Sequence, residues 1–168
     1  MRSRWTLRLG CCVLTAAVFA AVPASAQGAR RVSLTKRDEA AVERARGGAA
    51  RRLADAECRK VFADFRDAHG RTIEQNLEAW AMDPAEYVRI VPFVDGTGEF
   101  LCHREDVMLV SIPNVPRVIV CPGFAKMERL QPGAAPIMVI HEVLHTLGLG
   151  ENPPASTEIT RRVEARCR

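Results

Sequence analysis

The sequence predicts an α+β protein that is mostly helical, with a small antiparallel sheet or hairpin beside one central helix. Apolar residues recur at helical spacing in the first half of the chain and again near the C-terminus. Two short runs rich in β-branched residues, 107–112 and 117–121, are typical of strands. An apolar segment over residues 137–147 has the length of a buried helix. We expect residues 27–168 to form a single domain around this helix.

Residues 1–26 have the composition of a cleaved export signal. Three arginines form a basic lead, residues 9–22 are apolar and uncharged, and residues 24–26 form a small-x-small cleavage pattern. The apolar run is too short for a comfortable membrane span. We therefore expect a secreted or periplasmic protein with no membrane attachment after signal cleavage. Lipidation of an early cysteine is the alternative.

The net charge gives no argument for a nucleic-acid partner. The full chain has a formal charge of +4, and residues 1–26 contain three arginines and no acidic residue, so residues 27–168 carry 4 − 3 = +1. Proteins that bind nucleic acid depend on a clear excess of Lys and Arg. The basic character of the whole chain is therefore mostly a targeting charge.

The cysteines of the mature chain predict two disulfides. Their spacings are long and no C-x-x-C pair exists, so a thiolate zinc site or a thioredoxin-like centre is not expected. An even number of separated cysteines in an exported chain is typical of disulfides. Three pairings remain open among Cys58, Cys102, Cys121 and Cys167.

The first half of the mature chain is expected to be helical. After a loose polar entry over residues 27–37, a helix begins at Asp38, and the glycine pair at 47–48 interrupts it. A second helix then carries an inward apolar stripe and ends near His69. The stripe consists of Ala54, Cys58, Val61, Phe62 and Phe65.

Two shorter helical segments follow. Ile73, Leu77 and Trp80 have the spacing of a short helical stretch. Asp83 is expected to cap a brief helix that ends at Ile90, because a proline occupies the first helical position and a glutamate follows three residues after the cap.

The middle of the chain is expected to contain the β structure. A turn at residues 95–98 precedes a β-like segment at 99–102, and the strand-like runs 107–112 and 117–121 come next. The prolines in the loop at 113–116 favour a hairpin or an edge strand over a central strand. An edge strand beside the central helix would let an extended peptide add itself as a further strand.

The remaining helices complete the prediction. We expect a short helix at residues 124–130, a turn at 131–133, and Pro136 in the first turn of the central helix. A last helix at 157–166 would be capped by Ser156. Its inward face would hold Ile159, Val163 and Cys167.

A polar trio lies within the apolar central helix. His141, Glu142 and His145 form the pattern H-E-x-x-H, and residues four apart on a helix project from nearly the same face. Both imidazoles could bind one metal ion, and Glu142 would be near enough to take a proton from a water on it. A buried helix holds such polar groups at a cost unless a partner satisfies them. The pattern predicts a metal site with His141 and His145 as ligands and Glu142 as general base.

A catalytic zinc site usually has three protein ligands and a water, so a third ligand is required. Gly148 could adopt the left-handed conformation that reverses the chain, which would return Glu151 to the metal. Glu158 and Glu164 on the last helix remain as alternatives to Glu151.

Three other residues have simpler interpretations than a functional one. His69 is interpreted as an exposed histidine at a helix C-terminus, Tyr87 as a core residue with a solvated hydroxyl, and His103 as a surface histidine near a disulfide. The alternatives are a ligand role for His69, an oxyanion-holding role for Tyr87, and a substrate-polarising role for His103.

The segment from His141 to Glu151, H-E-V-L-H-T-L-G-L-G-E, resembles the zincin metallopeptidases and, among them, the metzincin pattern H-E-x-x-H-x-x-G-x-x-ligand. Metzincins carry His or Asp where this chain has Glu151, and no Met follows to form their Met-turn. Residues 118–124, V-I-V-C-P-G-F, also resemble the deuterolysin-like aspzincins, whose downstream Asp motif is missing here. The resemblance implies a zincin-like fold, a Zn²⁺ cofactor and peptide-bond hydrolysis, with His141 and His145 as ligands and Glu142 as base.

The resulting hypothesis is an exported, monomeric, zinc-dependent metallopeptidase-like hydrolase that acts on a peptide or protein substrate. Two other functions stay open: a secreted binding module braced by zinc without turnover, and a hydrolase that acts on cell-wall peptide amides. A fourth protein ligand such as His103 would favour the binding module, whereas an open position in a cleft would favour an enzyme. The chain has few aromatic residues to line a sugar-binding groove, which argues against a glycan partner.

Overall fold

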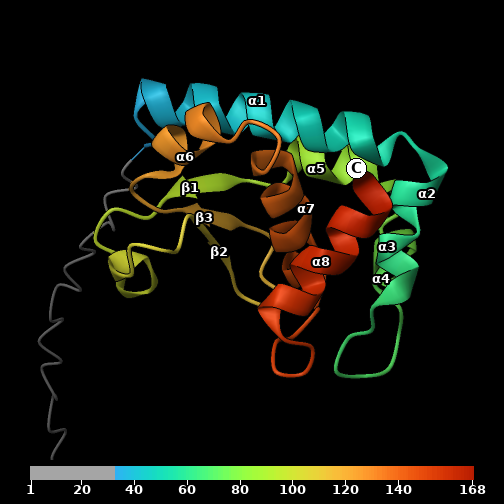
Figure 1. Cartoon of the computed structure of the whole chain (residues 1–168). Coiled ribbons are helices and arrows are strands. Elements are labelled where there is room, and N and C mark those ends of the chain that lie inside the picture. The colour runs from blue at the N-terminus through green and yellow to red at the C-terminus, as the bar shows by residue number, and fades with distance from the viewer. Residues whose placement is uncertain (1–32) are drawn as a thin grey trace, which may run out of the picture. The chain divides into compact units, whose positions relative to one another are not determined.

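The computed structural model describes residues 33–168, and this part of the chain is α+β as predicted. The predicted signal at 1–26 and most of the predicted loose entry lie outside the described residues. In Figure 1, helix α1 (Lys36–Leu53) runs along the top, above the small sheet and helix α7 (Ala135–Thr146), and α8 (Ser156–Cys167) packs against α7. No helix in residues 33–168 is both long and apolar enough to cross a membrane.

Helix α1 is longer than predicted, because the glycine pair at 47–48 does not interrupt it. Thr35 caps its N-terminus by accepting a hydrogen bond from the backbone N–H of Asp38. Gly48 lies where α1 packs against α7, and a Cβ atom there would be 2.5 Å from Cγ of Pro136. The glycine that suggested a helix break is thus explained by the close approach of two helices.

The predicted second helix is two short helices, α2 (Ala56–Arg59) and α3 (Val61–Asp64), so it ends before His69. Its apolar stripe is buried except for Ala54, which is exposed. Helices α4 (Ile73–Glu78) and α5 (Pro84–Ile90) confirm the next two predicted segments. The Asp83 side chain caps α5 by accepting a 2.9 Å hydrogen bond from the N–H of Glu86.

The sheet is mixed rather than purely antiparallel. Strands β2 (Leu109–Ser111) and β3 (Val118–Val120) form the predicted antiparallel pair, but β1 (Phe93–Asp95) pairs with β3 in parallel. The order β1-β3-β2 makes β3 the central strand and β2 an edge strand of this sheet. The predicted hairpin or edge strand is found in the antiparallel β2–β3 pair, in which β2 is the edge strand, but β3 is central because β1 pairs with its other side, and all three of its residues are buried.

The segment expected to be β-like at 99–102 is instead a 3₁₀ helix, η1 (Phe100–His103). The later helices agree closely with the prediction: α6 is Phe124–Leu130, and Pro136 lies in the first turn of α7. Ser156 is the first residue of α8 and does not cap it, since the capping position is Ala155. The inward face of α8 is buried as predicted, with Ile159 and Val163 fully inaccessible.

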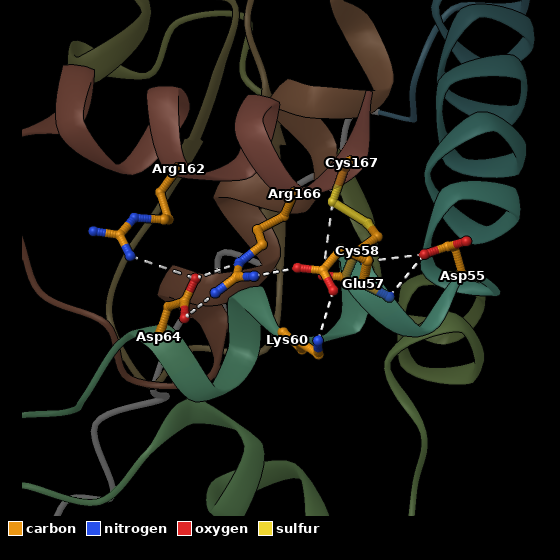
Figure 2. Close-up of polar contacts among 8 residues, drawn as sticks. All are labelled: Asp55, Glu57, Cys58, Lys60, Asp64, Arg162, Arg166 and Cys167. Carbon is orange, nitrogen blue, oxygen red and sulfur yellow. Dashed lines mark hydrogen bonds and ion pairs between the residues drawn. A yellow bond between two sulfur atoms is a disulfide. The ribbon is translucent and has the colours of Figure 1, made fainter.

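Two disulfides join Cys58 to Cys167 and Cys102 to Cys121, which confirms their predicted number. Such bonds persist in oxidising, extracellular environments. Figure 2 shows that the first disulfide is one part of a wider attachment of α8 to α2 and α3. Arg166 forms a two-pronged ion pair with Asp64, at 2.9 Å for both bonds, and also pairs with Glu57. The C-terminal helix is therefore held by covalent, ionic and apolar contacts together.

Candidate metal centre

Helix α7 directs two histidine rings toward one point. His141 and His145 lie one turn apart and are only 5% and 4% exposed. Their Nε2 atoms are 3.0 Å apart. Most of the other side chains of the helix are apolar, so the helix packs into the core and carries both imidazoles inward with it.

Glu151 reaches the same point from the chain that follows α7. Gly148 has φ +109°, so the chain reverses there in the left-handed region as predicted. The Glu151 Oε1 atom then lies 3.3 Å from Nε2 of His145 and 3.7 Å from Nε2 of His141. Of the described residues, these three side chains form the group that could hold a metal ion.

The spacing of the three atoms fits a tetrahedral zinc ion. Bonds of about 2.0–2.2 Å at tetrahedral angles place neighbouring ligand atoms about 3.3–3.6 Å apart. The three separations here, 3.0, 3.3 and 3.7 Å, bracket that range. Two imidazole nitrogens and one carboxylate oxygen are also a donor set that zinc accepts.

Both histidines have a second polar partner that orients the ring. Nδ1 of His145 donates a 2.7 Å hydrogen bond to the carbonyl oxygen of Leu149, and Nδ1 of His141 lies 2.9 Å from the hydroxyl of Thr160 on α8. Metal-binding histidines usually have their other ring nitrogen engaged in this way.

The surroundings keep His141 uncharged. Burial lowers the pKa of its imidazole to about 4, the nearby His145 adds to this effect, and Glu151 opposes it. A neutral imidazole is the form that binds a metal. His141 is therefore in the form that can bind a metal at neutral pH.

Glu142 lies beside this group and is not part of it. Burial raises the pKa of its carboxyl to about 7; Ser111 on β2 lowers it, and the charge of Glu151 raises it further. The Ser111 hydroxyl is itself buried, and the side chain and backbone N–H of Ser111 favour the charged form of Glu142 by hydrogen bonding. Glu142 is thus a shielded carboxyl near three candidate ligands.

A cleft of about 620 Å³ opens onto the site. Strand β2 forms one wall, the start of α8 forms another, and α7 forms the floor. Met108, Val110 and Met138 supply apolar surface, while the two histidines, Glu142 and Glu151 supply the polar surface. The cleft gives a ligand direct access to the candidate metal position.

The other residues weighed from the sequence lie away from the group. Glu158 is exposed, and Glu164 pairs with Arg168 at 2.9 Å. His69 and His103 are exposed. Tyr87 is a core residue as expected, but its hydroxyl is not solvated: it donates a 3.0 Å hydrogen bond to Thr146.

Sequence reasoning missed the residues that support the site. Thr160 and the carbonyl of Leu149 orient the two rings, and Ser111 lies close to Glu142. Asn76 donates hydrogen bonds to Asp67 and to the carbonyl of Leu147, which braces the end of α7. These contacts join segments far apart in the chain, so no local pattern in the sequence signals them.

The chain matches no protein-family model, no curated protein and no solved structure. The geometry of the site itself shows a group of His141, His145 and Glu151 that could bind a metal ion, next to a cleft.

Proposed function

We propose that this protein is an exported zinc-dependent hydrolase that cleaves peptide bonds. The observation that carries the proposal is the convergence of three ligand atoms at zinc-like separations on the floor of an open cleft that also contains Glu142. Three protein ligands with access from solvent are typical of catalytic zinc, whereas structural zinc has four protein ligands.

The likeness of residues 141–151 to the zincin metallopeptidases supports the same function. Glu151 stands where the metzincin pattern has His or Asp, and its carboxylate approaches both histidines. We therefore propose a zincin-type site with a glutamate as third ligand.

The residues divide the chemical work between them. Zinc at such a site supplies Lewis-acid polarisation of a carbonyl and a water acidic enough to lose its proton near neutral pH. His141, His145 and Glu151 would hold the ion, and the carboxylate of Glu142 would accept the proton of the attacking water. Glu142 would then deliver that proton to the leaving amine.

The cleft favours an extended peptide as substrate. Strand β2 has β3 as its one neighbour in the sheet of the described residues, and its residues line the cleft. A peptide in the cleft could add itself to this edge as a further strand. The apolar surface of Met108, Val110 and Met138 would favour apolar side chains in the substrate.

Replacement of Glu142 by Gln tests the proposal. We expect Zn²⁺ to bind as in the wild type and peptide hydrolysis to fall by about 100- to 10,000-fold, the usual contribution of a general base. Glu158→Gln, on the exposed face of α8, is the control and should keep full activity. Hydrolysis by Glu142→Gln at the wild-type rate would refute the role of Glu142.

The substrate panel should distinguish the other two functions. Cleavage of cell-wall stem peptides but not of protein-derived peptides would identify a cell-wall amidase. Zinc binding without cleavage of any peptide would indicate a zinc-braced binding module. We favour an enzyme because the metal-capable group of residues 33–168 contains three side chains and does not include His103.

A further inference from the structure

The two site histidines form a continuous chain of short polar contacts. It runs from the Thr160 hydroxyl to Nδ1 of His141, from Nε2 of His141 to Nε2 of His145, and from Nδ1 of His145 to the carbonyl oxygen of Leu149. The separations are 2.9, 3.0 and 2.7 Å, so each contact is a hydrogen bond if one hydrogen lies between the two atoms. The protons can be placed from the chemistry of the end groups.

The position of the His145 proton follows from its partner. A backbone carbonyl oxygen only accepts hydrogen bonds, so Nδ1 of His145 must carry the hydrogen. Neutral His145 then has a bare lone pair on Nε2, and this lone pair faces His141. His145 has the same tautomer whether or not a metal is bound.

His141 has no such constraint. Without a metal, a bare Nε2 on His141 would put two lone pairs 3.0 Å apart in a buried site, which is unfavourable. The favourable arrangement places the His141 proton on Nε2, where it is donated to His145. Nδ1 of His141 then needs a donor, and the Thr160 hydroxyl supplies one.

A metal reverses these roles. Both Nε2 atoms must then offer lone pairs to the ion, so the His141 proton must lie on Nδ1 and be donated to Thr160. A hydroxyl both donates and accepts, whereas a carbonyl or carboxylate only accepts. The ring loses one proton at Nε2 and gains one at Nδ1 through exchange with water, and Thr160 keeps its own proton and only rotates it.

We propose that Thr160 is a positioning residue whose hydroxyl reverses its hydrogen-bond direction, so that His141 changes tautomer when the metal binds while its ring stays in place. This inference rests on the proposed metal site. It explains why the partner of His141, Thr160, lies on α8. This helix is attached by the Cys58–Cys167 disulfide and by the Arg166–Asp64 ion pair (Figure 2). A firmly held helix keeps the hydroxyl at hydrogen-bond distance in both states.

The first test is long-range ¹H–¹⁵N correlation NMR of protein labelled at histidine, with and without Zn²⁺. The chain has four histidines, and the exposed His69 and His103 serve as internal references. We expect the His145 proton on Nδ1 in both states. The His141 proton should lie on Nε2 in the metal-free protein and on Nδ1 in the zinc-loaded protein. A His141 proton on Nδ1 in both states would overturn the proposal.

The second test compares zinc affinities by competition with a chelator. Thr160→Val keeps the shape of the side chain but removes the hydroxyl, and we expect affinity to fall by about 10- to 100-fold, as for other partners of metal-binding histidines. Thr160→Ser should restore most of it. Ala165→Val, on the exposed face of the same helix and outside the cleft, is the control.

The outcomes separate this inference from the proposed function. If the wild type binds Zn²⁺ and Thr160→Val binds it equally well, the positioning role of Thr160 is refuted and the metal site stands. If the folded wild type binds no Zn²⁺, the proposed function and the metal-linked tautomer change are both refuted.

Discussion

Each ring nitrogen of His141 and His145 faces an identified polar group. The Nδ1 atoms face a hydroxyl and a carbonyl that orient the rings, and both Nε2 atoms face the point that Glu151 also approaches. An ordinary buried histidine pair needs no carboxylate at the point that both Nε2 atoms face. The metal proposal therefore depends on three side chains whose individual contributions can be measured.

Replacement of Glu151 by Ala tests whether this residue is the third zinc ligand. Glu151 is 41% exposed, so its loss should leave the fold intact. We expect zinc affinity to fall by more than the roughly 10- to 100-fold that follows removal of a ligand's hydrogen-bond partner. Affinity should be unchanged in Glu158→Ala, and isothermal titration calorimetry would measure both. If Glu158→Ala lowered zinc affinity more than Glu151→Ala, Glu151 would not be the third ligand.

Asp67 makes part of the stability dependent on pH. Its side chain is 2% exposed, and the pKa of its carboxyl is held well below the usual range, mainly by the hydrogen bond from Asn76, with further bonds from His69 and Arg71. Because the folded-state pKa is depressed, the carboxylate contributes stability at all pH values above the unfolded pKa of about 3.9 and loses it as the pH falls further.

Asp67→Asn should therefore be less stable than the wild type at neutral pH. We expect the difference in the free energy of unfolding to be constant above about pH 5 and to shrink below about pH 4. Urea unfolding across this range would measure it. A difference that does not change with pH would show that the charge of Asp67 contributes nothing.

At the residue scale, the sequence was informative where one helix sets the geometry. His141, Glu142 and His145 were placed from spacing alone, because four residues are about one helical turn. Glu151 required a further assumption about the Gly148 turn, which the structure confirms. Thr160 could not be found, because a threonine on an amphipathic helix has no pattern until the partner helix is in place.

At the element scale, the crossing of α1 and α7 positions the candidate site. Pro136 begins the helix that carries both histidines, and Gly48 lets α1 approach its ring. A Cβ atom at the neighbouring Gly47 would have the Arg51 side chain as its nearest contact, at 3.5 Å. The two glycines therefore differ in packing but share one helix.

Gly48→Ala and Gly47→Ala form a matched pair that tests this crossing. Both variants gain about 1 kcal/mol of helix propensity, but only the Cβ at residue 48 would collide with Pro136. We expect Gly48→Ala to be less stable than Gly47→Ala by about 1–3 kcal/mol in urea unfolding, the usual cost of overpacking. Equal stabilities would show that the contact with Pro136 yields without cost.

Elements with strong end signals were predicted well. Asp83 and Pro84 marked α5, and prolines and glycines bounded α6. Strand β1 was missed because three residues are too few to show an alternation, and its parallel partner β3 lies more than twenty residues further along the chain. Strand β3 is central because β1, which was not predicted, pairs with it on the side opposite to β2.

At the scale of the whole molecule, the C-terminal helix α8 is attached to α2 and α3, far back along the chain. The Cys58–Cys167 disulfide closes a separation of 109 residues, and Cys102–Cys121 closes one of 19. In the chain-entropy account, a longer closed loop stabilises more, by about 4.7 kcal/mol for about 100 residues against about 3 kcal/mol for about 15. The Cys58–Cys167 disulfide should therefore contribute more to the free energy of unfolding than Cys102–Cys121.

Replacing both cysteines of each pair by Ala tests this order. We expect Cys58→Ala/Cys167→Ala to lose about 1.5 kcal/mol more than Cys102→Ala/Cys121→Ala in urea unfolding, from loop length alone. The first variant should also bind zinc more weakly, because α8 carries Thr160. Greater stability of the first variant than of the second would contradict the proposed importance of the α8 attachment.

The central claim is that His141, His145 and Glu151 together hold one zinc ion. Its most direct test is the zinc content of the purified, oxidised protein by elemental analysis after equilibration with Zn²⁺ and removal of free metal. We predict one zinc ion per chain in the wild type and none in His145→Ala, with both proteins folded by circular dichroism. A folded wild type that retains no zinc, or a His145→Ala variant that retains as much as the wild type, would contradict the account.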